Sequence, residues 1–121
     1  MEEFQNTKKN YDLEERTYLF AEKTRDYVKA LPKTISNNEY GRQLIRSSGS
    51  QAGNYIEADE SLGVKDFRMR IRICRKEAKE SRLWLRLSEP DNDHQKMKEG
   101  LLQEALELTK IFGSILENYK K

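Results

Sequence analysis

Residues Phe67–Leu87 read FRMRIRICRKEAKESRLWLRL, and this stretch decides the fold because it carries two conflicting hydrophobic patterns. At its start Phe67, Met69, Ile71 and Ile73 alternate with arginines, as in a half-buried strand. From Ile71 onward, apolar and small residues recur at steps of three and four, which is the spacing of one helix face. The helical pattern covers the whole stretch, so we predict a helix.

Placed at roughly 100° per residue, the side chains of this helix fall into three sectors. One is an inner stripe of apolar and small residues: Phe67, Ile71, Cys74, Ala78, Ser81 and Leu85. A second apolar strip lies nearly opposite and consists of Met69, Ile73, Trp84 and Leu87. The third sector, the basic line, consists of Arg68, Arg72, Arg75, Lys79, Arg82 and Arg86.

The three sectors predict three kinds of contact. The inner stripe would pack inside the protomer, the second apolar strip would contact another subunit, and the basic line would face solvent or a polyanion. Two alternatives stay open. The second apolar strip could be enclosed within a single bundle, and the basic line could be a solvated face or could pair with acids from another helix. Glu77 and Glu80 fall outside the basic line, so this helix does not neutralise it.

Outside this stretch the sequence predicts three more amphipathic helices. The four expected ranges are 13–31, 37–60, 64–88 and 94–119, after a flexible arm at 1–10. The first and third helices end before Pro32 and Pro90, and Ser36 with Glu39 has the spacing of a capping box at the second. Four such helices joined by short turns favour an all-α, antiparallel up-down-up-down four-helix bundle. We expect residues 1–121 to form one domain.

The second predicted helix carries small residues in its middle, including Gly49 and Gly53. A glycine costs about 1 kcal/mol relative to alanine inside a helix. Close approach of a neighbouring helix would offset this cost, whereas the alternative is a helix that breaks near Gly49. Its expected inner face consists of Gly41, Leu44, Ile45, Ser48, Ala52, Tyr55 and Ile56.

Composition excludes several classes of protein. The chain of 121 residues has a net charge of +2, and the excess of cations lies in residues 64–92. Its start lacks the apolar core of a signal peptide, and no apolar run approaches the length of a membrane span. We expect a soluble, cytoplasmic, bacterial protein without membrane contact. The single cysteine, Cys74, precludes an intramolecular disulfide.

No set of residues for catalysis or for metal binding can be assembled. His94 is the one histidine, and one histidine with one cysteine cannot form a structural zinc site within a chain. The glycines lack the G-K-[ST] ending of a phosphate-binding loop, and no Glu-x-x-His pair of a di-iron bundle occurs. We therefore predict no enzyme activity, no catalytic residues, no metal and no cofactor.

The basic line is the remaining functional feature. It contains five arginines, whose guanidinium groups suit bidentate phosphate contacts. We predict binding of an RNA or DNA backbone by a non-enzymatic homo-oligomer, because repeating the line around an axis concentrates positive potential. The alternative is a protein-protein adaptor or scaffold, for example for a reverse transcriptase or a ribonucleoprotein, that does not touch nucleic acid.

The segment NEYGRQLIRSSGSQAGNYIEA (38–58), with Phe67 and RKEAKESRLWL (75–85), resembles the 23S ribosomal RNA intervening sequence proteins, also called S23 ribosomal proteins. The resemblance extends from about residue 13 to residue 119, and its most specific residues are Gln43, Leu44, Arg46, Ser47, Ser48, Asn54, Ile56, Glu57, Ala58, Glu77, Ala78, Glu80 and Ser81. It implies an antiparallel four-helix bundle and a homopentamer. A related member, the accessory variability protein of diversity-generating retroelements, engages a reverse transcriptase and nucleic acid. No established catalytic activity is implied.

Overall fold

The computed structural model describes the backbone of residues 2–119 and the side chains of residues 13–119. Within this range the chain forms four α-helices: α1 (Glu2–Ala30), α2 (Ile35–Asp59), α3 (Val64–Leu87) and α4 (Gln95–Asn118). A single turn of 3-10 helix, η1 (Asn92–His94), precedes α4. No residue from 2 to 119 lies in a strand, so the helical interpretation of the stretch Phe67–Leu87 is confirmed.

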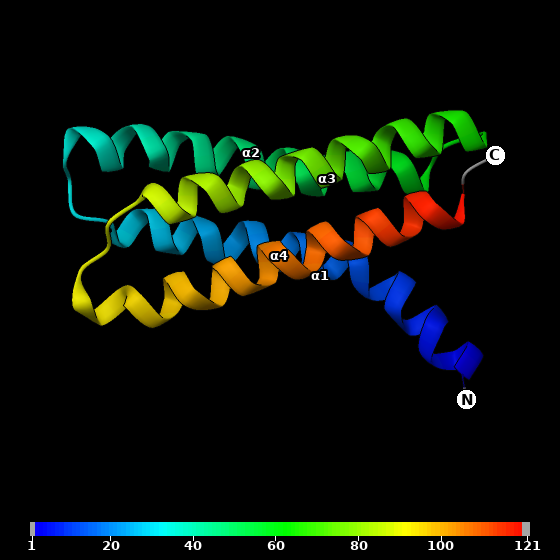
Figure 1. Ribbon diagram of the computed structural model, residues 1–121, viewed down its shortest axis with the longest axis horizontal. Coiled ribbons are helices and arrows are strands. Elements are labelled where there is room, and N and C mark those ends of the chain that lie inside the picture. Colours follow the sequence, from blue (N-terminus) through cyan, green and yellow to red (C-terminus); the bar gives the residue numbers. More distant parts are fainter. Residues whose placement is uncertain (1, 120–121) are drawn as a thin grey trace.

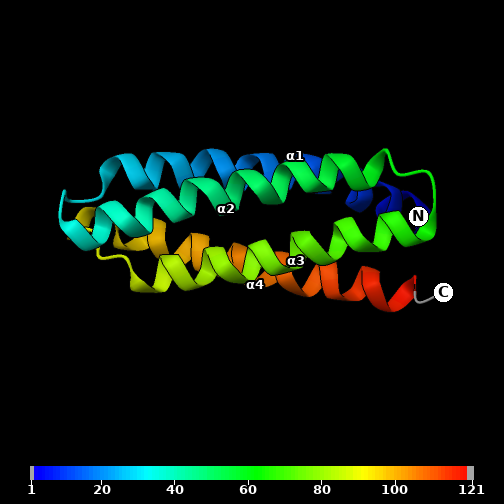
Figure 2. The same ribbon diagram turned by 90° about the horizontal axis from the view of Figure 1, so that it is seen from above.

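The helices run antiparallel to one another in chain order (Figures 1 and 2). The α1–α2 and α3–α4 connections lie at one end of the molecule, and the α2–α3 connection lies at the other (Figure 1). α3 packs most extensively, against α2 on one side and α4 on the other. The predicted all-α up-down-up-down bundle is confirmed, and α3 occupies a central position in it.

Two predicted helix starts are wrong. α1 begins at Glu2 and so includes residues 2–10 of the expected flexible arm, because no glycine or proline in residues 2–12 interrupts the backbone hydrogen bonds. The cap of α2 is Thr34 and not Ser36: the Thr34 hydroxyl accepts a hydrogen bond from the Asn37 backbone N–H at 3.1 Å. Ser36 therefore lies inside the first turn, where its hydroxyl is exposed.

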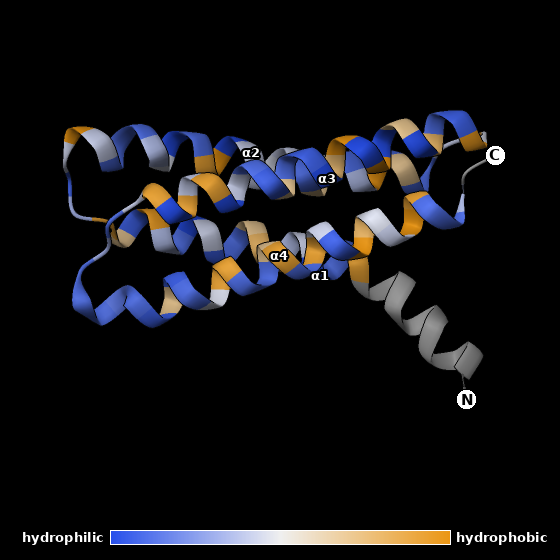
Figure 3. Ribbon diagram, in the orientation of Figure 1, coloured by the Kyte–Doolittle hydropathy of each residue, from blue (hydrophilic) through white to orange (hydrophobic). Residues whose placement is uncertain are grey.

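Hydrophobic residues recur along all four helices (Figure 3), and their buried side chains form one core. Its largest fully buried members are Tyr27 and Phe20 of α1, Leu44 of α2, Ile71 and Leu85 of α3, and Leu108 and Phe112 of α4. The inner stripe of α3 was predicted correctly, since all of it is buried except the half-buried Phe67. On α2, however, Ile45 and Ile56 are 45% and 49% exposed, because the face that α1 and α3 cover is centred on Leu44, Ser48 and Tyr55.

The small residues of α2 do not all mark close helix packing. A Cβ atom added to Gly41 would lie 2.9 Å from Cγ1 of Val28, so the absence of a side chain lets α1 and α2 approach there. At Gly49 and Gly53 an added Cβ would meet nothing within 4 Å among the described residues. The expectation of tight packing at Gly49 and Gly53 is therefore wrong within the protomer, although α2 does continue unbroken through both.

Polar contacts join the two connections at one end of the bundle. The Asn37 side-chain amide donates to the backbone carbonyls of Pro32 and Glu89, each at 3.0 Å, and its carbonyl accepts from the Glu89 N–H at 2.9 Å. Close by, the hydroxyls of Tyr27 and Ser88 are 2.7 Å apart. These bonds couple the end of α3 to α1 and α2.

Helices α1 and α4 make the fewest contacts of the neighbouring pairs. A groove of about 490 Å³ lies between them, and both apolar side chains such as Phe20 and Leu101 and charged side chains such as Lys23 and Asp26 line it. Arg16 of α1 crosses to α4 and pairs with Glu104 at 2.8 Å and Glu107 at 3.1 Å. These ion pairs join α1 to α4 and include no cation of α3.

Candidate nucleic-acid interface

The basic line follows the flank of α3 that faces α4. Gly113 of α4 lies beside it, since a Cβ atom added there would be 4.0 Å from Nε of Arg75. Arg72, Arg75, Lys79 and Arg86 are exposed, whereas Arg68 and Arg82 are half-buried. A row of cations therefore occupies the α3 side of the α3–α4 surface.

Arg68 differs from the other members of the basic line. Its Nη1 atom donates to the backbone carbonyls of Leu116 and Tyr119, at 2.5 and 2.6 Å. These carbonyls belong to the last turn of α4, where helical carbonyls lack partners within the helix. Arg68 thus caps α4, and its guanidinium is less available to a ligand.

Arg82 also has a distinctive environment. Its Nε atom is buried and has no hydrogen-bond partner among the described residues. Arg82 as a whole is half-buried, as is usual for an arginine whose aliphatic stem lies along apolar surface. Only the outer part of this guanidinium can reach a phosphate.

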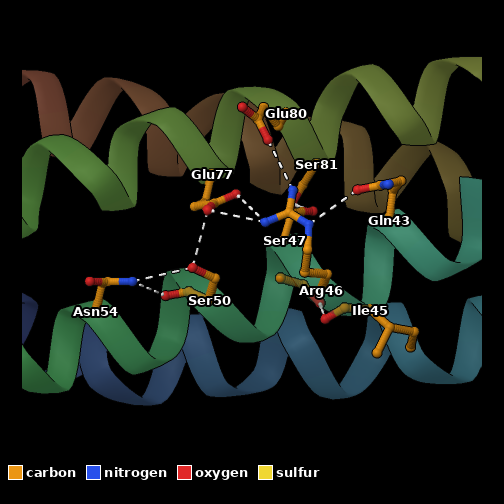
Figure 4. Close-up of polar contacts among 10 residues, drawn as sticks. Gln43, Ile45, Arg46, Ser47, Ser50, Asn54, Glu77, Glu80 and Ser81 are labelled. Atoms are coloured by element: carbon orange, nitrogen blue, oxygen red, sulfur yellow. Dashed lines mark hydrogen bonds and ion pairs between the residues drawn. The ribbon is translucent and has the colours of Figure 1, made fainter.

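No carboxylate of residues 13–119 forms an ion pair with any member of the basic line. The two acids in the middle of α3 explain this, because both turn toward α2 (Figure 4). Arg46 of α2 binds Glu77 at 3.3 Å and Glu80 at 3.0 Å. Glu77 and Glu80 thus pair with Arg46 on the α2 side of α3, while the basic line has no carboxylate partner among residues 13–119.

Glu77 is the most enclosed ionisable group in this arrangement, with a side chain only 6% exposed. Its carboxylate also accepts a hydrogen bond from the Ser50 hydroxyl at 3.1 Å. For Arg46, burial lowers the pKa of the guanidinium, but the carboxylates of Glu77 and Glu80 outweigh burial and raise it above its ordinary value. Arg46 therefore stays charged at neutral pH.

Further polar contacts extend this seam between α2 and α3 (Figure 4). Ser47 and Ser81 meet in the core with their hydroxyls 2.7 Å apart. Asn54 donates to the Ser50 carbonyl and accepts from Arg70 of α3 at 3.0 Å. The sequence indicates this seam only through the position of Ser81 on an apolar stripe and through the family resemblance, because Arg46, Ser47, Asn54, Glu77, Glu80 and Ser81 are among its most specific residues.

The second apolar strip divides into two parts. Trp84 is half-buried and stacks on Tyr40 of α2, with ring centroids 6.1 Å apart, and Ile73 is half-buried too. Met69 and Leu87 are 45% and 44% exposed, and Leu83 beside them is exposed as well. Trp84 is therefore partly enclosed within its own bundle, whereas Met69 and Leu87 remain accessible to a partner.

Other chemistry among the described residues is limited. No group of three or more His, Cys, Asp or Glu side chains in this part of the chain could hold a metal ion. His94 bonds its capping residue, since its Nδ1 is 2.7 Å from an oxygen of Asp91. None of the helices within residues 2–119 combines the length and apolar character needed to cross a membrane.

Comparison with known proteins agrees with this architecture. No protein-family model matches the sequence, and no curated protein matches it. Among solved structures, the chain is similar to a protein of unknown function from the S23 ribosomal protein family of Bacteroides thetaiotaomicron, with 23% identity and a TM-score of 0.71. The match covers 85% of this chain and 96% of that chain. The chain thus has the four-helix fold of an S23 family protein, which is the fold that the resemblance implied.

Proposed function

We propose that this protein is a non-enzymatic homo-oligomer of helical bundles that binds the phosphate backbone of RNA or DNA through the basic line. The observation that carries the proposal is the segregation of charge on α3. Its acids Glu77 and Glu80 are paired with Arg46, whereas the cations on the opposite flank have no carboxylate partner among residues 13–119. Unpaired arginines on a rigid helix are suited to phosphate contacts.

Members of the basic line have different roles in this proposal. The exposed side chains of Arg72, Arg75, Lys79 and Arg86 contact phosphates directly. Arg82 adds a partly enclosed guanidinium, and Arg68 mainly holds the end of α4 against α3. Contacts of this kind neutralise phosphates without reading bases, so binding is expected to be independent of sequence.

Assembly is the second part of the proposal. The resemblance implies a homopentamer, and the exposed Met69 and Leu87 supply apolar surface for a subunit contact. A symmetric ring repeats the basic line, so a nearly neutral chain gains a concentrated positive surface. We place this oligomer in the bacterial cytoplasm, where RNA and DNA are accessible.

Charge reversal tests the nucleic-acid proposal. The variant Arg72→Glu/Arg75→Glu/Lys79→Glu changes only exposed side chains. Wild type is expected to bind a generic nucleic acid with an affinity that falls steeply with salt, because each neutralised phosphate releases counterions. The variant should bind at least about 100-fold more weakly at low salt, and the log–log salt slope should become shallower by about three. Fluorescence anisotropy over a salt series measures both.

A matched control separates the basic line from net charge. Lys29→Glu/Lys33→Glu/Lys96→Glu makes the same change in total charge at exposed positions away from α3. This control should retain most of the affinity, and circular dichroism should show both variants fully helical. Equal affinity of wild type and the α3 variant would contradict the proposal.

A protein adaptor is the second candidate function, and the exposed Met69, Leu83 and Leu87 favour it because apolar surface can bind a polypeptide. Under this alternative, the protein would bind a purified reverse transcriptase encoded beside its gene after nuclease treatment. Substituting Met69 and Leu87 with glutamine would abolish that binding, whereas charge reversal on the basic line would not.

A further inference from the structure

We infer, building on the proposed function, that the basic line binds a double helix in preference to a single strand. The chemistry recognised is an ordered row of phosphates held at fixed spacing, which duplex RNA and duplex DNA share. The inference rests on the straightness of the line, on the kind of side chains beside it, and on the energetic difference between ordered and disordered phosphates.

The first step is geometric. From Arg72 to Arg86 the line lies on one continuous α-helix, and the fourteen helical steps between these two residues correspond to about 21 Å. α3 contains neither glycine nor proline, the usual causes of a sharp kink, and its ribbon runs without a break (Figure 2). The cations are therefore carried on a rigid rod and cannot follow a flexible chain around bends.

The second step concerns aromatic side chains. Proteins that bind single strands gain about 1–3 kcal/mol per base by stacking bases on aromatic rings. Along the central part of the basic line the apolar neighbour is aliphatic, since Leu83 lines a shallow hollow together with Arg72, Arg75, Lys76, Lys79 and Glu80. The ring pairs of the described residues lie elsewhere: Tyr40–Trp84 between α2 and α3, Tyr55–Phe112 in the core, and Phe67–Tyr119 beside Arg68.

The third step is energetic. A single strand must lose conformational freedom to align its phosphates with a straight row, and the aliphatic Leu83 beside the central cations cannot offset that loss by stacking on bases. In a duplex, the phosphates already have ordered positions before the protein binds. It also carries one negative charge per about 1.7 Å of axis, against about 3.4 Å for one strand. Along about 21 Å, a duplex presents about twelve charges and a strand about six, so the duplex gains more from the same five cations.

The test compares matched ligands on the full chain: a 20-base-pair RNA duplex, a DNA duplex of the same sequence, and each separate strand chosen without self-complementarity. Fluorescence anisotropy should show each duplex binding at least about 10-fold more tightly than its strands at equal salt. The variant Arg72→Glu/Arg75→Glu/Lys79→Glu should weaken duplex binding most. A preference between the RNA and DNA duplexes then identifies which double helix is the better ligand.

An aromatic control addresses stacking directly. Tyr119→Leu removes the half-exposed ring nearest the line, and it should leave the ratio of duplex to strand affinity unchanged. Strands that bind as tightly as duplexes, or a Tyr119→Leu variant that weakens strand binding selectively, would overturn the duplex inference and leave the proposed function intact. Failure of every ligand to bind at low salt would overturn both.

Discussion

At the scale of single residues, Cys74 shows how helix packing sets chemical reactivity. It is fully buried on the inner stripe of α3, and its thiol donates to the Gln51 backbone carbonyl at 3.5 Å. Burial raises the pKa of the Cys74 thiol to about 12, because an enclosed apolar site disfavours the thiolate. Cys74 is thus a packing residue and not a nucleophile at neutral pH.

We predict that native Cys74 does not react with Ellman's reagent at pH 8 on a timescale of minutes, whereas the denatured chain reacts at once. Because of this raised pKa, the Cys74 thiol keeps its proton to a higher pH in the native state than in the unfolded state. This contribution to stability is complete below the ordinary cysteine pKa and declines as the pH rises toward about 12. Stopped-flow labelling between pH 8 and 10 tests the predicted low reactivity of the native thiol. Rapid labelling of the native protein would contradict this prediction.

The sequence predicts burial well along the inner stripe of α3 but does not indicate every buried polar side chain. Periodicity places Ile71, Cys74 and Leu85 in the core, as observed. Gln51 is equally buried, and neither its amide nitrogen nor its amide oxygen has a hydrogen-bond partner among residues 13–119. An amide normally indicates an exposed position, because burying it without a partner costs about 1–3 kcal/mol. Only the arrangement of the neighbouring helices shows that this residue is enclosed.

At the scale of helices, the polar seam between α2 and α3 fixes which flank of α3 faces which neighbour. Breaking a buried ion pair by removing one partner leaves an uncompensated charge, whereas exposed pairs contribute little. Glu77 is nearly enclosed and depends on Arg46 from the other helix. The seam thereby determines the side of the molecule on which the basic line emerges.

We predict that Arg46→Ala lowers the free energy of unfolding by about 2 kcal/mol. Glu77→Gln should cost less, since it can still accept the Ser50 hydrogen bond without leaving a buried charge. The stability loss of the double variant should be smaller than the sum of the two single losses by about 1 kcal/mol, as expected for side chains in contact. Urea denaturation measures each value.

Arg42→Ala provides the matched control, because Arg42 lies on the same helix and forms an exposed pair with Glu39 at 3.5 Å. Its removal should change stability by less than about 0.5 kcal/mol. Strictly additive effects at Arg46 and Glu77 would show that the two charges do not interact.

Across the whole molecule, the number and order of the helices follow from sequence because each has its own apolar stripe and because Pro32 and Pro90 separate them. The location of the basic line on one face of α3 also follows from spacing alone. Residue spacing cannot show which flank of α3 each neighbouring helix covers. Trp84 illustrates this limit, since the same strip could contact a second subunit or Tyr40 of the same chain.

Assembly is the property on which the strength of the proposed surface depends, because one chain has a net charge of only +2. We predict that wild type is an oligomer by light scattering and that Met69→Glu/Leu87→Glu is a folded monomer. Both side chains are about half-exposed in the protomer, so their replacement should cost little stability. Trp84→Glu should instead lower the thermal midpoint, because it removes the stack on Tyr40.

Ile35→Gln/Leu62→Gln is the control, since these residues are exposed apolar side chains at the ends of the bundle. It should keep the native mass of wild type. If both double variants retain that mass, the subunit contact lies on another surface, and the exposed Ile45 and Ile56 of α2 become the apolar surface to test next. A monomeric wild type would mean that each chain presents only its own row of cations, and a duplex would then dissociate at much lower salt.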